Sequence, residues 1–172
     1  MAPWARLPWG GKKTGANPTD RGKLGVKRSL LIEGHGVPLG LVVDGANRHD
    51  CKLLEATLQN LPVPRPTPTP EHPQHVCLDK GYDYDFVRKL LILAAFLGHI
   101  RPLGEETSQI VKDPRQPPRR WKVERTGSWF NRFRGVLIRW CKKPENYLAF
   151  CHFVGGVIAL RMAYALADCQ SG

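Results

Sequence analysis

The sequence lacks several features that would place it in other protein classes. Its five cysteines are odd in number and form no C-x-x-C pair, which argues against a disulfide framework or a zinc ribbon and fits a reducing cytosol. No basic-then-apolar signal segment opens the chain. The longest apolar stretch, about 14 residues from Tyr147 to Leu160, is shorter than the roughly 20 needed to cross a bilayer. We therefore expect a cytoplasmic protein without membrane contact, in which this stretch is a buried helix.

Acidic residues are scarce relative to basic ones. The chain has 26 Lys and Arg against 15 Asp and Glu, a formal charge of +11. The excess concentrates between Lys112 and Lys143, where eleven basic residues accompany two acids, and in the first 28 residues, where Asp20 is the one acid. Such a balance is expected of a protein that meets a polyanion, so nucleic acid is the first partner to consider. The alternative is a basic surface that serves only solubility.

The length of 172 residues predicts one domain. Residues 1–22 are rich in Gly, Pro, Lys and Arg and show no period, which predicts an irregular basic arm before a domain at 23–168. Two β-rich runs, Ser29–Glu33 and Val37–Asp44, flank Gly34-His35-Gly36 and predict a hairpin. A helix with leucines at helical spacing should follow Asp50, and six prolines within 62–73 predict an extended loop.

The second half of the chain alternates strands and helices, which is typical of an α/β fold. A strand at His75–Leu78, a helix at Tyr84–Leu97 and a strand at about His99–Arg101 predict a crossover and parallel pairing. From Arg119 the helical period returns, and a last helix is expected at about Glu145–Ala167. An apolar stripe is predicted on the helix that begins near Arg119, formed by Trp129, Phe133, Val136, Leu137 and Trp140.

Asp79 ends the short apolar strand and is followed by Lys80 and Gly81. In open α/β sheets ligands collect at the carboxyl ends of strands, so an acid in this position is well placed to hold a cation. The alternative is that Asp79 only caps the turn or pairs with Lys80. A neighbouring cluster, His72, His75 and Cys77, lacks a second ligand pair and is better explained by chance than by zinc.

Glu124 is the second candidate acid, and it lies within the basic helical stretch. Placed at 100° steps, the apolar stripe falls on the opposite side of that helix, so Glu124 should face away from the core. Arginines flank it: Arg132 and Arg139 on one side and Arg134 on the other. A carboxylate between arginines is what a phosphodiester site requires, with a metal ligand in the middle and phosphate clamps at the edges. The alternative is an exposed helix on which Glu124 pairs with Arg120 or Arg125.

Three blocks of the sequence carry a family resemblance. They are NPTDRGKLGVKRSLLIEGHGVPLGLVVDGANRHD, LDKGYD and RRWKVERTGSWFNRFRGVLIRWCKKPENYLAF. Together they resemble the catalytic domain of bacterial insertion-sequence transposases of the DDE type, specifically the fifth insertion-sequence family. The similarity runs from about Gly10 to Ala163, with the blocks in the family's order.

The resemblance implies an α/β fold of the RNase H-like kind, a mixed sheet flanked by helices, in which two Asp and one Glu bind two Mg²⁺ or Mn²⁺ ions. The second Asp falls on Asp79 and the Glu on Glu124, which makes both catalytic and metal-binding candidates. The implied partner is DNA, transposon ends and target, in a nucleoid-associated cytoplasmic protein. The residues expected to bind DNA are Lys23, Lys27, Arg28, Arg120, Arg125, Arg132 and Arg139.

The sequence departs from this family at its start. In register, the first Asp of the triad would fall at about position 1, which is Met1, so this carboxylate and the first strand of the sheet are expected to be lacking. The expected function is DNA transposition by metal-dependent hydrolysis and strand transfer, inactive in this chain alone. An upstream-frame product, joined by a programmed frameshift, could supply what is lacking, and a homo-oligomer is a further expected partner. The alternative is a non-catalytic basic remnant that binds DNA.

Overall fold

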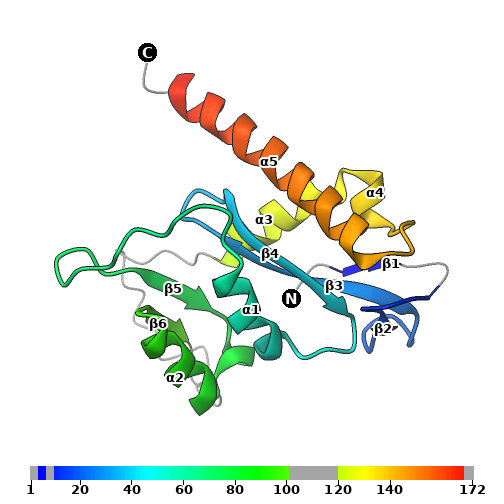
Figure 1. Cartoon of the computed structure of the whole chain (residues 1–172), viewed down its shortest axis with the longest axis horizontal. Helices are drawn as coiled ribbons and strands as arrows, with labels where there is room; N and C mark the ends of the chain where they lie inside the picture. The colour runs from blue at the N-terminus through cyan, green and yellow to red at the C-terminus, as the bar shows by residue number, and fades with distance from the viewer. Residues whose placement is uncertain (1–3, 7–9, 101–119, 169–172) are drawn as a thin grey trace.

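The structure, a computed structural model, describes residues 4–6, 10–100 and 120–168, with the side chains of Trp4, Arg6 and Arg120 left undescribed. The chain is a mixture of strands and helices (Figure 1). The elements follow in the order β1 (Trp4–Arg6), β2 (Gly15–Ala16), β3 (Leu24–Ile32), β4 (Pro38–Gly45), η1 (Asp50–Leu53), α1 (Leu54–Gln59), β5 (His75–Leu78), η2 (Lys80–Tyr82), α2 (Asp85–Leu93), β6 (Leu97–Ile100), α3 (Arg120–Asn131), α4 (Arg134–Leu137) and α5 (Pro144–Asp168).

Strand β3 is the centre of an antiparallel sheet. It pairs with β4 from Val26 opposite Gly45 to Ile32 opposite Pro38, which confirms the predicted hairpin. The turn between them is held by Glu33, whose carboxylate accepts hydrogen bonds from the N–H groups of His35 (2.7 Å) and Val37 (3.0 Å). This carboxylate accepts hydrogen bonds from N–H groups that a tight turn leaves without backbone partners. The hairpin is therefore stabilised by a residue of its own turn.

The N-terminal segment contributes to the same sheet. Strands β1 and β2 both pair antiparallel with β3, with Ala5 opposite Val26 and Gly15 opposite Gly25. Ala5 is fully buried. The prediction of an irregular arm over residues 1–22 is therefore wrong for these two strands. Both strands are too short to show a period in the sequence. They are ordered because they pair with backbone N–H and C=O groups along the edge of β3.

A second sheet consists of β5 and β6. The two strands are parallel, with His75 opposite Leu97 and Leu78 opposite Ile100, and α2 connects them. This confirms the predicted crossover, although α2 ends at Leu93, earlier than expected. Ala95 then takes a left-handed conformation (φ 53°) that closes the helix end and turns the chain into β6.

The proline-rich loop before β5 is attached to the end of α2. The guanidinium of Arg65 donates to the carbonyls of Ala94 (2.6 Å) and Ala95 (2.9 Å) and lies 3.7 Å from the ring centre of Phe96. Its Nε also donates to the side chain of Gln74, which in turn donates to the carbonyl of Pro66 (2.8 Å).

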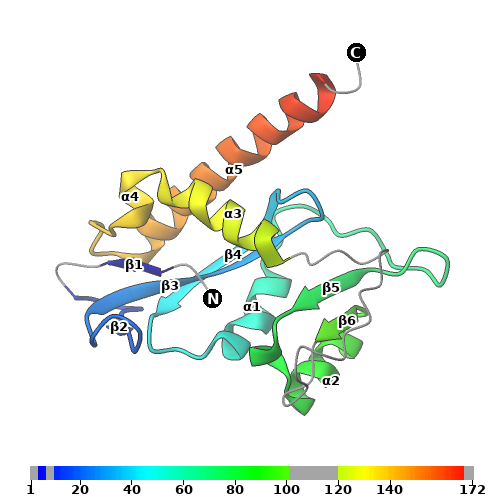
Figure 2. The same cartoon turned by 180° about the vertical axis from the view of Figure 1, so that it is seen from behind.

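The antiparallel sheet has helices on both faces, and Figures 1 and 2 show α3 and α5 on one side of β3 and β4 and α1 on the other. One apolar cluster joins Val26, Leu41 and Val43 of the sheet to helices α3–α5. A second joins α1, β5 and α2 through Leu54, Val76 and Val87, among others. The molecule is thus an α/β fold with two adjoining cores, as the alternation of strands and helices predicts.

The basic helix is not continuous, and here the sequence prediction is wrong. α3 ends at Asn131, and Phe133 takes an extended conformation (φ −89°, ψ 109°) before α4 begins at Arg134. The predicted apolar stripe assumed one helix through Trp140, so its angles do not hold beyond Asn131. In α3 the buried side chains are Thr126 and Phe130. The break lets Phe133 and Val136 enter the core from a different direction than a straight helix would give.

Helix α5 is 25 residues long, and by length and composition it could cross a membrane. Its buried side chains are Pro144, Tyr147, Cys151, Val154 and Ile158, all within its first fifteen residues. Figure 2 shows its C-terminal half extending away from the sheet and the other helices. The prediction of a buried last helix therefore holds for one face of the first half only.

Candidate active site

Asp79 lies at the carboxyl end of β5, as the sequence predicted. Its extended backbone (φ −78°, ψ 171°) makes it the N-cap of η2, and its Oδ1 accepts a hydrogen bond from the N–H of Gly81 at 2.9 Å. The carboxylate is thereby held in one orientation. The capping role that was the alternative to a metal-binding role is therefore present, and it occupies one of the two oxygens.

The surroundings of Asp79 contain a half-buried tyrosine, Tyr82. Burial, together with the nearby carboxylates of Asp50 and Asp79, raises the pKa of Tyr82 well above its ordinary value. The raised pKa favours the protonated phenol, which is a hydrogen-bond donor. Asp50 forms an ion pair with Lys27, with 2.9 Å between Oδ1 and Nζ. Asp50, expected only to begin the first helix, thus belongs to the same neighbourhood as Asp79.

Glu124 lies in the first half of α3, and its side chain is exposed. The helix that carries it is fastened to the β3–β4 turn by three side chains from one helical turn. Lys122 donates to the carbonyl of Gly34, Arg125 to that of His35 at 2.6 Å, and Thr126 to that of Gly36 at 2.8 Å. We call this set of contacts the turn clamp. It fixes how far α3 is rotated and shifted along the sheet, and hence where Glu124 lies.

Two tryptophans complete the turn clamp. The guanidinium carbon of Arg125 lies 4.6 Å from the ring centre of Trp121 and 4.8 Å from that of Trp129. These residues are spaced at four positions on either side of Arg125, so both rings lie on its side of the helix. A cation between two aromatic faces is stabilised by both, which restrains the arginine toward the hairpin. Sequence reasoning missed the turn clamp, although the W-x₃-R-x₃-W spacing signals it.

The structure does not assemble a complete metal centre from the residues it describes. Within 4–6, 10–100 and 120–168, no three or more histidine, cysteine, aspartate or glutamate side chains are grouped to hold a metal ion. This finding covers Asp79 and Glu124 and also His72, His75 and Cys77. The convergence of Asp79 and Glu124 on one site stays a prediction.

Two of the predicted DNA-binding arginines are buried, which corrects that prediction. Arg28 is 1% exposed and donates to Asn131 Oδ1 at 2.6 Å and to the carbonyl of Val136 at 3.4 Å. Arg139 is 0% exposed and donates to the carbonyls of Lys12, Cys141 and Lys142. Arg28 thereby joins β3 to the end of α3 and to α4, and Arg139 joins the segment around Lys12 to the segment before α5.

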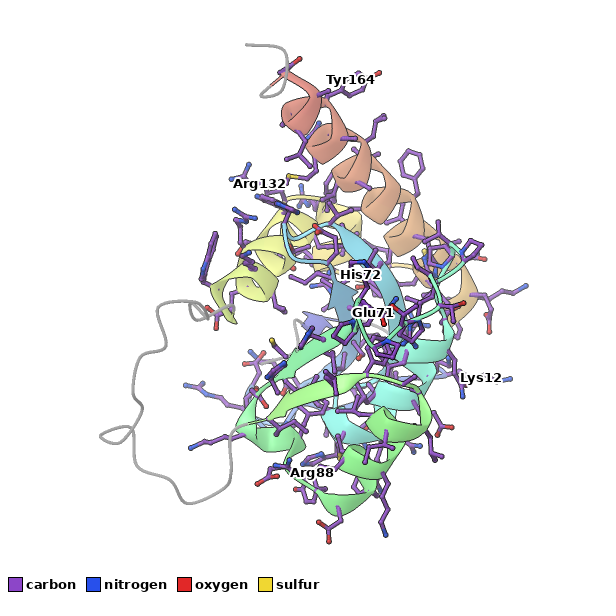
Figure 3. All side chains as sticks on the ribbon, turned by 90° about the vertical axis from the view of Figure 1, so that its left-hand side faces the viewer. Lys12, Glu71, His72, Arg88, Arg132 and Tyr164 are labelled. Carbon is purple, nitrogen blue, oxygen red and sulfur yellow. The ribbon has the colours of Figure 1, made fainter. Side chains whose placement is uncertain are left out.

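The other predicted DNA-binding cations differ in how accessible they are. Lys23 and Arg132 are exposed, and Figure 3 shows Arg132 on the outer side of the molecule. Lys27 is held by Asp50, and Arg125 by the turn clamp. The side chain of Arg120 lies outside the described residues. Among the six candidates whose side chains are described, Arg132 and Lys23 are therefore the most accessible to a phosphate backbone, although Lys23 Nζ lies 3.7 Å from Asp20 Oδ1.

Comparisons with known proteins agree on one family. The family described as "Transposase DDE domain" matches residues 4–152 of the chain. A protein described as "Putative transposase for insertion sequence element IS402", from Burkholderia cepacia, is 31% identical over 153 residues, an alignment that covers 83% of this chain and 66% of that relative. The chain thus spans just under two thirds of this relative's length. No solved structure matches it significantly. With the family matched over most of its length and both candidate acids inside the matched range, the chain belongs to the DDE-type insertion-sequence transposases.

Proposed function

We propose that the chain from β1 to α5 is a DDE transposase catalytic domain of the RNase H-like kind that acts on DNA by metal-dependent phosphodiester hydrolysis and strand transfer. One observation carries this proposal: the family match from residue 4 to residue 152 includes both Asp79 and Glu124. The position of Asp79 supports it, because the carboxyl ends of parallel strands are where α/β sheets bind ligands.

The two acids suit a divalent cation such as Mg²⁺ or Mn²⁺ in chemical type. Mg²⁺ is usually held by one or two carboxylates together with water and substrate phosphates. Asp79 uses one oxygen for the N–H of Gly81, and its other oxygen accepts no hydrogen bond that the described residues supply. In this role the ions would activate the attacking oxygen and stabilise the leaving one. Asp79 and Glu124 would be the residues that hold them.

The chain's own contribution is to position these groups. The bond from Gly81 fixes the direction of the Asp79 carboxylate, and the turn clamp fixes the helix that presents Glu124. The exposed cations Lys23 and Arg132 would bind backbone phosphates, which supplies salt-dependent affinity without reading sequence. Precise placement matters because small errors in the position of a reacting group are costly in rate.

Metal binding by the isolated chain tests the proposed site. We expect Mn²⁺, followed by its electron paramagnetic resonance signal, to bind the wild-type protein. Asp79→Asn and Glu124→Gln should each weaken binding by about tenfold or more, because each removes one of few ligands. Asp85→Asn, an exposed acid on the neighbouring helix α2, is the matched control and should have no effect. Equal binding by wild type and both site variants would exclude these residues from the site.

A second candidate function is a basic protein that binds DNA without catalysis. The net charge of +11 favours it. Anisotropy titrations with a labelled duplex distinguish the two functions. A non-catalytic binder should lose affinity steeply with salt, require no Mg²⁺ and be unaffected by Glu124→Gln. Metal-dependent cleavage of the duplex, lost in Asp79→Asn, would exclude this second candidate.

A further inference from the structure

The parallel pair of strands β5 and β6 has one covered face and one open face. Figures 1 and 2 show the two strands side by side next to α2. Val76, Leu78 and Ile100 belong to the apolar cluster that includes α2, so they mark the covered face. Successive side chains of a strand point to opposite faces, and the residues of the open face are all exposed. They are His75 and Cys77 of β5 and Leu97 and His99 of β6.

Two histidines meet on this open face. Nδ1 of His75 lies 2.7 Å from Nε2 of His99, a hydrogen bond between residues 24 positions apart in the sequence. The ring planes differ by 20° and the ring centres are 5.0 Å apart, so the bonded nitrogens lie between the rings and face each other. Such a bond requires one nitrogen that carries a proton and one that offers a lone pair. The pair thus brings two imidazole nitrogens together at one point of the surface.

Converging imidazole nitrogens suit a divalent transition ion. Imidazole is a ligand for Zn²⁺, Cu²⁺ and Ni²⁺, whereas Mg²⁺ and Mn²⁺ prefer oxygen ligands. A Zn–N bond is about 2.0–2.1 Å long, so two nitrogens on one tetrahedral zinc ion are roughly 3.3 Å apart. The observed 2.7 Å is shorter by roughly 0.6 Å, a difference that two exposed rings can make up by turning about χ2, which is a soft torsion in histidine.

We propose that His75 and His99 together bind a divalent transition ion of the zinc class on the open face of β5 and β6. On binding, the proton that lies between the two nitrogens moves to the other nitrogen of its ring, and both lone pairs then point at the metal. Water fills the remaining positions of the ion. Two protein ligands are fewer than the groups of three or more that the described part of the chain does not form. This inference does not depend on the proposed catalytic function.

A metal ion at this position fastens a short sheet. Four residue pairs join β5 to β6, and two strands by themselves are only marginally stable. The register places His75 opposite Leu97 and His99 opposite Cys77, so an ion shared by the histidines connects one strand to the other across the ladder. Asp79 follows directly after β5. The ion therefore also restrains the strand that carries this candidate acid.

This site differs from the cluster of His72, His75 and Cys77 that is visible in the sequence. Its second ligand is His99, which comes from the neighbouring strand, so no local spacing indicates it. Cys77 lies opposite His99, and its thiol is free and exposed. A thiolate is itself a zinc ligand, so the experiment has to separate its contribution from that of the histidines.

Isothermal titration calorimetry of the full chain with zinc chloride, in excess Mg²⁺, tests the proposal over about 1–500 μM zinc, a range that covers micromolar dissociation constants. The wild type should bind zinc. His75→Gln and His99→Gln should each weaken binding by about tenfold or more, because each removes one of two protein ligands. Both residues are exposed, so circular dichroism should show an unchanged fold. The exposed His72→Gln is the matched control and should bind like the wild type, as should Cys77→Ser.

Thermal melting supplies a second measurement. An ion that binds the folded chain at about 100 times its dissociation constant should raise the melting temperature of the wild type by roughly 5–10 °C. The same zinc concentration should raise that of His75→Gln and His99→Gln by much less, because these variants are far from saturation.

Three results would overturn the proposal. Equal zinc affinity in the wild type, His75→Gln and His99→Gln would show that the two rings form a hydrogen bond and nothing more. A loss of affinity in Cys77→Ser as large as in the histidine variants would assign zinc binding to the thiol. A wild type that melts at the same temperature with and without zinc would show that no ion fastens the folded sheet.

Discussion

Replacing Thr126 with Val isolates the most buried bond of the turn clamp. The two side chains have nearly the same shape, and Thr126 is fully buried, so the change removes a hydroxyl and little else. That hydroxyl lies 2.8 Å from the carbonyl oxygen of Gly36 and 3.0 Å from that of Lys122. The carbonyl of Lys122 is part of helix α3 itself. The carbonyl of Gly36 is buried between the turn and the helix, and the substitution removes its side-chain donor. Leaving such an acceptor unsatisfied costs about 1–3 kcal/mol.

The measurement is urea denaturation followed by circular dichroism. With a slope of about 2 kcal/mol per molar urea, a loss of about 2 kcal/mol lowers the midpoint by about 1 M. Ser128→Ala is the matched control, because Ser128 bonds the carbonyl of Glu124 in the same manner on the exposed side of α3. Its midpoint should move by less than about 0.25 M, as surface substitutions usually do. If Thr126→Val were no more destabilising than Ser128→Ala, the hairpin contact would not be holding α3.

Three further outcomes can be checked by melting or denaturation. Gly36→Ala should lower the free energy of unfolding by about 1–3 kcal/mol, because Gly36 has a φ of 97° and an added Cβ would lie 3.0 Å from a side-chain oxygen of α3. Gly34→Ala is the control: its added Cβ meets nothing within 4 Å, so the change should be nearly neutral. Burial acts to raise the pKa of Glu33, but hydrogen bonds from the turn outweigh it and hold that pKa below the ordinary value of 4.5. The stabilisation from Glu33 is thus present above pH 4.5 and lost as the pH falls through the lower, folded-state pKa, so Glu33→Gln should flatten the loss of stability between about pH 5 and 3. Arg28→Ala should lower the free energy of unfolding by about 3 kcal/mol, because it removes a buried donor and its packing. The exposed control, Arg132→Ala, should lower it by less than about 0.5 kcal/mol. Equal melting temperatures for the two variants would contradict the buried role of Arg28.

The parts of the fold that the sequence predicts correctly are those set by local patterns. The hairpin follows from two β-rich runs around Gly34-His35-Gly36, and the parallel pair follows from a strand, a helix and a strand in close succession. The placement of Asp79 at a strand end follows from the same reading. These features depend on residues within about twenty positions of one another, so local sequence patterns are enough to predict them.

The parts that the sequence does not predict depend on distant contacts. Arg28 and Arg139 were expected on the surface because charged residues are rarely buried. Arg28 donates to partners more than 100 positions away, and Arg139 joins two nearby carbonyls to that of Lys12, 127 positions away, which no local pattern indicates. The break at Phe133 has a similar cause, since the segment continues to look helical while the core requires a change of direction.

The proline-rich loop shows how much can depend on one side chain. Proline has no N–H to donate, so a segment with six prolines between residues 62 and 73 cannot be secured by a ladder of backbone hydrogen bonds. Arg65 supplies three hydrogen bonds and a ring contact in their place. Only one of these contacts, the one with the ring of Phe96, reaches the edge of an apolar core, so the loop could be lengthened while the buried side chains of both cores stay in place. Natural or engineered insertions in this chain should therefore be tolerated best between α1 and β5, provided that Arg65 is kept.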